Sequence, residues 1–205
     1  MKPEEIESLS FSIIDSEAGD HGFQPEQWKI VQRMIHTSAD FEYIKSVKFH
    51  DQAISAGIDA IRNGCRIVTD TNMAKSGIRK GEISAFGGDV HCFISDKDVV
   101  KRAAAEGITR AVAAVDKACE MEEESIFVIG NAPTALLRLM ELVKSKKVKP
   151  ALIIGLPVGF VNAAESKDAL MELDSPHISN KGRKGGSNIV ASIVNALAIM
   201  AAKKR

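Results

Sequence analysis

Short, mostly apolar runs alternate with helical segments along this chain, and that alternation limits what the chain can fold into. The runs are four to six residues long, as is typical of parallel strands that helices cover on both faces. We therefore predict strands at 65–69, 89–94, 125–129 and 151–154.

The segments between these runs carry the usual signals of helix ends. An aspartate can cap a helix N-terminus, a glycine often ends the helix, and a proline favours the first turn. These signals predict helices from Asp51 to Gly64, from Asp96 to Gly107, over 26–35 after Pro25, and over 134–144 after Pro133. Strands that alternate with helices predict an α/β fold with a mainly parallel sheet.

The length and charge of the chain restrict its class. It has 205 residues without a Pro/Gly/Ser-rich linker, so we predict one domain that spans residues 1–205. Its 27 Lys and Arg residues balance 27 Asp and Glu residues, whereas a nucleic-acid binder normally has a basic excess. We therefore expect no nucleic-acid partner.

Targeting signals and cysteine usage both favour a cytoplasmic protein. The residues that follow Met1 lack the apolar stretch of a signal peptide, so we expect none. The longest apolar run, 189–202, is shorter than the roughly 18 residues that a membrane span needs, so we expect no membrane partner. Isolated cysteines outside any CxxC motif are typical of buried thiols in a reducing compartment. They are Cys65, Cys92 and Cys119.

Three glycine-bearing loops fall at the carboxyl edge of the predicted sheet, which is where such sheets bind ligands. They lie at 130–134, 155–159 and 182–187. Each can present backbone N–H groups to an anion, and the first and third lead into a helix N-terminus. One glycine turn alone is more often an ordinary chain reversal. Three at one edge indicate a ligand site without identifying the ligand.

Several common site chemistries lack their sequence signature. The loop 182–187 does not have the Gly-Lys-Ser/Thr ending of a P-loop, and the chain contains no GxGxxG. No residues have the spacing of metal ligands or of a nucleophile with its base. An α/β enzyme that binds a phosphorylated or dinucleotide ligand at the glycine loops therefore stays the weaker alternative.

Several stretches resemble the precorrin-8X methylmutase family. They come in the family's order and span nearly the whole chain, although the resemblance does not extend over 37–40. The longest has 13 residues, at 155–167, and is too specific for a chance match. The other stretches are 10–11, 33–36, 107–110, 130–136 and 182–187.

The resemblance implies a three-layer α/β/α fold, a homodimer and a corrinoid substrate, which is a tetrapyrrole with several carboxylates. The implied reaction is an isomerisation that moves a methyl group from ring carbon 11 to ring carbon 12, giving hydrogenobyrinic or cobyrinic acid. The migrating group stays within the conjugated ring, so no cofactor is implied, and any cobalt belongs to the substrate.

His36 matches the catalytic histidine of the family. It lies at the end of the helix that follows Pro25, where the helix dipole favours a protonated imidazole. A proton offered to a ring nitrogen would polarise the π system during the shift. Without the resemblance, a lone histidine at a helix end is more often a capping or surface residue.

Two further residues match positions that the family places at the substrate, and a third lies beside one of them. Ser10 matches a substrate-contacting serine, and Arg110 matches an arginine whose guanidinium can grip a carboxylate in two places. Thr109 beside it can add a hydroxyl donor. The basic pair Arg183-Lys184 fits a solvated surface and a binding site equally well.

One alternative within corrinoid chemistry remains. A non-catalytic corrinoid carrier would keep the pocket but not the chemistry, and the presence of His36 in its motif favours the enzyme over the carrier.

Overall fold

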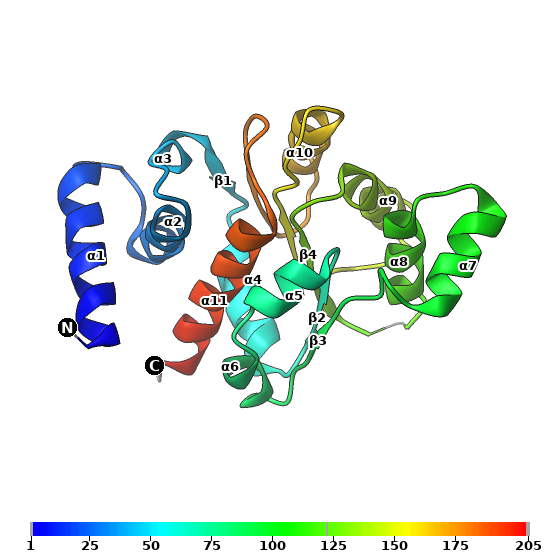
Figure 1. Ribbon diagram of the computed structural model, residues 1–205, viewed down its shortest axis with the longest axis horizontal. Coiled ribbons are helices and arrows are strands. Elements are labelled where there is room, and N and C mark those ends of the chain that lie inside the picture. The colour runs from blue at the N-terminus through cyan, green and yellow to red at the C-terminus, as the bar shows by residue number, and fades with distance from the viewer. Residues whose placement is uncertain (1, 122, 204–205) are drawn as a thin grey trace.

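The structure is a computed structural model that describes residues 2–121 and 123–203. Within these residues a six-stranded sheet lies between two layers of helices (Figure 1). Its strands are β1 (Val47–Phe49), β2 (Arg66–Thr69), β3 (Val90–His91), β4 (Ser125–Ile129), β5 (Leu152–Gly155) and β6 (His177–Asn180). The order across the sheet is β1-β6-β5-β4-β2-β3. Strand β1 runs antiparallel to β6, and the remaining pairs are parallel.

Helices cover both faces of this sheet. On one face lie α2 (Pro25–Ser38), α4 (Ala53–Arg62), α5 (Asn72–Gly77), α6 (Lys80–Ser84) and α11 (Ser187–Ala202). On the other lie α7 (Lys97–Glu106), α8 (Arg110–Cys119), α9 (Pro133–Lys144) and α10 (Ala163–Met171). Helix α1 (Pro3–Ala18) packs on the outside of α2, and α3 (Tyr43–Ser46) leads into β1. The predicted three-layer α/β/α fold with a mainly parallel sheet is confirmed.

The central strand β4 shows why its sequence is apolar throughout. Ile126 and Val128 point into the core beneath α11, whereas Phe127 and Ile129 point into the core beneath α8 and α9. All five residues of the strand are buried. A strand covered on both faces has no position that favours a polar side chain.

The predicted strands are confirmed, but one is shorter than expected. Strand β3 comprises Val90–His91 rather than 89–94, because it is an edge strand that pairs with β2 alone. The chain then turns, and Phe93 accepts a backbone hydrogen bond from Asp96 and buries its ring in the second core.

Two strands, β1 and β6, lack the expected apolar pattern and were not predicted. Strand β6 carries three polar residues, yet all four of its residues are buried. Its polar groups find partners inside the fold: the Ser179 hydroxyl donates to the Gly155 carbonyl at 2.7 Å. A polar strand is therefore stable here because its neighbours supply hydrogen bonds.

The helix predictions hold with two adjustments. Helix α4 begins at Ala53 with Gln52 at its N-cap, so the predicted cap, Asp51, lies one residue before the observed one. Helix α2 runs to Ser38, three residues beyond the predicted 26–35, and ends where Ala39 adopts a left-handed conformation. His36 therefore lies within the last turn of this helix. No helix in the described part of the chain is long and apolar enough to cross a membrane.

Candidate active site

The three predicted glycine loops lie side by side at one edge of the sheet. They follow β4, β5 and β6, which are neighbours in the sheet and parallel to one another. Backbone hydrogen bonds join them: the Val158 N–H donates to the Gly130 carbonyl at 3.2 Å, and the Gly186 N–H donates to the Leu156 carbonyl at 3.0 Å. The prediction that these loops share one edge is confirmed. We call this edge, with residues 70–73, 130–134, 155–162 and 181–187, the rim.

Glycine is required where these loops touch. A Cβ atom on Gly185 would lie 2.0 Å from the Leu156 carbonyl oxygen. A Cβ atom on Gly130 would lie 2.9 Å from the backbone of Gly186. Both distances are shorter than any stable contact, so the rim owes its close packing to the missing side chains.

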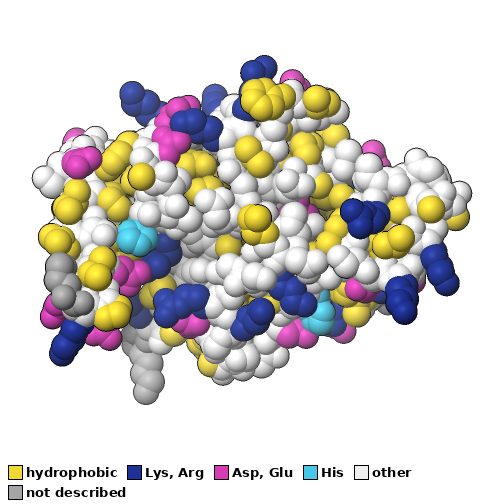
Figure 2. Space-filling model, viewed as in Figure 1, with side chains coloured by type: hydrophobic (Ala, Val, Ile, Leu, Met, Phe, Trp, Pro, Cys, Tyr) yellow, Lys and Arg dark blue, Asp and Glu magenta, His cyan; other side chains and the backbone are white. Residues whose placement is uncertain are grey.

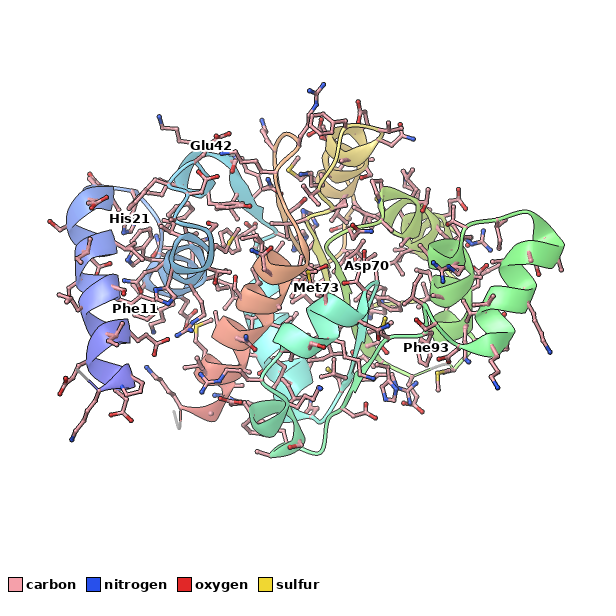
Figure 3. The ribbon with its side chains drawn as sticks, in the orientation of Figure 1. Phe11, His21, Glu42, Asp70, Met73 and Phe93 are labelled. Atoms are coloured by element: carbon pink, nitrogen blue, oxygen red, sulfur yellow. The ribbon has the colours of Figure 1, made fainter. Side chains whose placement is uncertain are left out.

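Asp70 anchors the first of these loops from the end of β2 (Figure 3). One carboxylate oxygen accepts the N–H of Gly130 at 3.1 Å, and the other accepts those of Asn131 and Ala132, both at 2.8 Å. The side chain is buried, and this burial raises the pKa of Asp70 while the three donors oppose the shift. The sequence prediction missed this residue; its signal is an acidic side chain directly after a buried strand.

Thr109 and Arg110 lie next to this anchored loop, at the start of α8. The Thr109 hydroxyl accepts the Val112 N–H at 3.2 Å, which caps the helix, and lies 3.2 Å from the Thr134 hydroxyl. The Arg110 side chain is exposed. Both residues line a cavity of about 320 Å³ together with Asp70. Arg110 is thus available to a ligand, whereas the hydroxyl of Thr109 already has a structural role.

His36 and Ser10 form a second group, where α1 packs on α2. The exposed imidazole of His36 stands edge-on to the ring of Phe11, with 5.2 Å between ring centroids. The Arg33 guanidinium lies over the same ring at 5.2 Å. Ser10 precedes Phe11 on α1, and its hydroxyl donates to the Ile6 carbonyl at 2.8 Å. Ser10 can therefore still accept a hydrogen bond, but its own proton is engaged within α1.

An ion pair joins the His36 end of α2 to the rim. The Lys184 ammonium in loop 181–187 lies 2.5 Å from the Asp40 carboxylate and 2.6 Å from that of Glu42. The hydrogen bond from Lys184 lowers the pKa of Asp40, and the same contacts raise the pKa of Lys184. The segment after His36 is thereby tied to a glycine loop 144 positions away.

The structure does not bring the two groups of predicted residues into contact. Helix α2, which carries His36, packs into one core, and α8, which carries Arg110, packs into the other. The two helices lie on opposite sides of the sheet in Figure 1. Among residues 2–121 and 123–203, no hydrogen bond or ion pair connects Ser10 or His36 to Thr109 or Arg110. The glycine loops lie between the two groups.

The rim combines exposed apolar side chains with cations. Phe160 is 84% exposed, Val161 78% and Met73 71%. The Arg183 guanidinium lies 5.4 Å above the Phe160 ring. Figure 2 shows hydrophobic side chains gathered along the upper edge of the molecule, over α10 and the neighbouring loops. Such a surface suits a flat apolar ring that carries carboxylates, because guanidinium groups bind carboxylates in two places.

The four histidines that were predicted to be structural have local contacts of their own. His21 stacks on Trp28 with 3.8 Å between centroids, and His91 pairs with Asp89. His50 and His177 face each other near a groove of about 820 Å³ between α10 and β1. Burial lowers the pKa of His177. Lys181 and Gly182 of the rim line this groove, but Ser10, His36, Thr109 and Arg110 do not.

Comparison with known proteins gives a consistent result. The family model for precorrin-8X methylmutase matches residues 5–200. The cobalt-precorrin-8 methylmutase of Priestia megaterium is 49% identical, covering 98% of this chain and 89% of its own length. That of Leptospira interrogans is 46% identical, covering 97% and 94%.

A solved structure agrees in fold over almost the same range. The precorrin-8X methylmutase of Thermus thermophilus superposes with a TM-score of 0.90 at 44% identity, covering 97% of this chain and 96% of that one. The family model and these relatives each cover far more than half of the chain, and they confirm the resemblance seen in the sequence. The chain therefore belongs to the precorrin-8X methylmutase family.

Proposed function

We propose that this chain is an isomerase of cobalamin biosynthesis that moves a methyl group within a corrinoid ring. The substrate is precorrin-8X or cobalt-precorrin-8, and the methyl group moves from ring carbon 11 to ring carbon 12. The family match over residues 5–200 carries this proposal. The glycine loops of the resembling stretches meet at one rim that offers apolar surface and cations, which supports a carboxylate-rich ring as the ligand.

His36 is the proton donor in this proposal. Its imidazole is exposed in the last turn of α2, where the helix dipole stabilises a positive charge. The edge contact with Phe11 limits the orientations of the imidazole ring. A proton shared with a ring nitrogen draws electron density from the π system while the methyl group changes carbons. A positioned acid of this kind typically contributes about 10²–10⁴-fold to a rate.

The other predicted residues bind the substrate. Arg110 is exposed at a cavity on the rim, so its guanidinium can take a substrate carboxylate. Thr109 lines the same cavity, and Ser10 lies beside Phe11 on α1, so each can offer a hydroxyl oxygen to the substrate. We propose no protein-bound cofactor, because the migrating group never leaves the ring, and any cobalt arrives inside the substrate.

We further propose that residues 1–205 act as one cytoplasmic domain and assemble as a homodimer. The large exposed fractions of Phe160, Val161 and Met73 support a second copy that covers the rim. The separation of His36 from Arg110 supports a site to which both copies contribute.

Replacement of His36 tests the catalytic role. We expect His36→Ala to abolish nearly all methyl migration in a single turnover followed by the absorbance of the ring. Binding of the corrin product should remain, because carboxylate contacts dominate it. His36→Asn should retain more binding than His36→Ala, since its amide still offers a hydrogen bond, but it cannot supply the proton.

A matched control is His91→Ala, which removes another partly exposed imidazole far from α2. This variant should turn over at the wild-type rate. A His36→Ala enzyme that converts substrate within a few-fold of wild type would refute the proton-donor role. A wild-type protein that binds the corrinoid tightly without turnover would instead favour the non-catalytic carrier.

A further inference from the structure

A lysine lies fully buried beneath the rim. Lys167, on α10, has an exposed fraction of 0%. Its ammonium donates to the backbone carbonyl of Lys184 at 2.6 Å and to the side-chain oxygen of Asn180 at 3.3 Å. Both acceptors belong to the end of β6 or to the loop that follows it.

A buried ammonium is costly, so its contacts require an explanation. Taking a charged amine out of water costs several kcal/mol unless its protons are bound. Burial lowers the pKa of Lys167 to about 8, which is the sign of that cost. Nearby positions on the same helix, such as Leu170 and Ala163, are apolar and equally buried. Fold stability alone would favour an apolar side chain here.

The protons of Lys167 are directed at the loop that bears the basic pair. Asn180 reinforces the contact, because its amide donates to the carbonyls of Lys181 at 3.1 Å and Lys184 at 3.0 Å. The Lys184 carbonyl thus receives two donors from within the fold. With its backbone held from inside, the loop places its side chains outward.

Two side chains of this loop reach toward different parts of the candidate site. Arg183 lies over Phe160 on the exposed rim. Lys184 pairs with Asp40 and Glu42, at the end of the segment that carries His36. A displacement of the loop would therefore move a candidate carboxylate ligand and release the contact to α2 together.

We propose that Lys167 is a positioning residue of the corrinoid site. By holding the Lys184 carbonyl, it fixes loop 181–187 so that Arg183 meets a carboxylate of the bound ring. This inference rests on the proposed function for its ligand, but the contact between Lys167 and the loop can be tested without any ligand.

The test is a double-mutant cycle with Lys167→Met and Arg183→Ala. Methionine keeps the unbranched apolar chain and removes the donors. We expect Lys167→Met to weaken binding of the corrin product roughly tenfold, the usual effect of a lost charge-assisted hydrogen bond, and to raise KM more than it lowers kcat. Arg183→Ala should weaken binding clearly in the wild type but hardly at all in the Lys167→Met background, because the arginine is already misplaced there.

Ser166→Ala is the matched control. Ser166 is the neighbouring residue on α10 and is equally buried, but its hydroxyl donates to Ala163 at 3.2 Å within the helix. This variant loses a buried hydrogen bond without touching the loop. Its product affinity should match that of the wild type, and Arg183→Ala should keep its full effect in this background.

Limited proteolysis provides a readout that needs no corrinoid. Trypsin cleaves after Arg183 and Lys184, and we expect this cleavage to accelerate in Lys167→Met but not in Ser166→Ala. Should Lys167→Met fail to fold, Lys167→Gln takes its place in the test. Its neutral amide is a weaker donor group than an ammonium, so this variant should show a smaller effect of the same kind.

The outcomes separate the two hypotheses. Wild-type cleavage together with additive effects of the two substitutions on product affinity would overturn the positioning role. If cleavage is faster in Lys167→Met but the wild type binds no corrinoid, the contact between Lys167 and the loop is supported and the proposed function is contradicted.

Discussion

Lys167 and Cys65 are both buried, yet their ionisation changes stability in opposite directions as the pH rises. Burial disfavours the charged form of each group. It lowers the pKa of Lys167 from 10.5 to about 8 and raises that of the Cys65 thiol from 9.0 to about 12. Between pH 8 and 10.5 the unfolded chain holds a proton on Lys167 that the folded chain has lost, so the free energy of unfolding rises with pH. Between pH 9 and 12 the folded chain holds a thiol proton that the unfolded chain has lost, so stability falls.

We therefore expect two variants to respond to alkaline pH in opposite ways. Relative to Lys167→Met, the wild type should gain free energy of unfolding above about pH 8, with a slope that approaches about 1.4 kcal/mol per pH unit. Relative to Cys65→Ala, it should lose free energy of unfolding above about pH 9. Urea unfolding at a series of pH values measures both differences. The contributions of titrating groups that the wild type and the variant share cancel in each difference. Parallel curves for wild type and variant would contradict the assigned shift.

At the scale of elements, the loop after β6 contains two glycines with different requirements. Gly182 has a φ of +81° and open space where a side chain would stand. Gly185 packs directly on the Leu156 carbonyl, 2.0 Å from an added Cβ. Gly182 needs glycine for its backbone conformation alone, whereas Gly185, with a φ of +159°, needs it for its backbone conformation and also for the contact between two loops.

This difference predicts unequal effects of one methyl group. Gly182→Ala should cost roughly 1 kcal/mol of stability from the left-handed backbone alone. Gly185→Ala should cost more and also weaken product binding, because the loop must separate from Leu156. Thermal unfolding and an absorbance titration of both variants make the comparison. Equal losses in the two variants would show that the contact between the loops is unimportant.

Which elements the sequence can reveal depends on where their stability comes from. The apolar strands β2, β4 and β5 were predictable, because burial on both faces shows in each residue. Strand β6 was not, since Ser179 and Asn180 are stable there only through partners on other elements. The glycine loops were visible in the sequence. The roles of Asp70 and Lys167 were not, because they depend on carbonyl and N–H groups that folding brings to them, and the sequence signals only that Asp70 directly follows a buried strand.

At the scale of the whole molecule, the two groups of predicted site residues lie on opposite sides of the sheet. If a second copy brings its Arg110 to the His36 of the first, each site of a homodimer contains residues from both chains. If each chain holds a complete site, a second copy contributes only stability. Light scattering should give twice the chain mass in either case, so the mass alone does not distinguish the two arrangements.

Mixing two impaired variants does distinguish them. In a shared site, a dimer of one His36→Ala chain and one Arg110→Ala chain has one intact and one doubly altered site. Random reassembly should therefore restore about a quarter of the wild-type sites, since half of the dimers are mixed. The assay is turnover after unfolding and refolding the two variants together, with each variant refolded alone as the control. No recovery would indicate sites confined to single chains.

Helix α11 packs against α2, α4 and α5, although it follows all three of them by more than 100 positions. Its side chains Ile193, Val194 and Leu197 are fully covered by those earlier helices and by the sheet. On the ribosome, α2, α4 and α5 are synthesised long before the helix that fills the space between them. The apolar faces of those three helices therefore stay uncovered on the nascent chain until α11 has emerged, and over that interval they are open to aggregation.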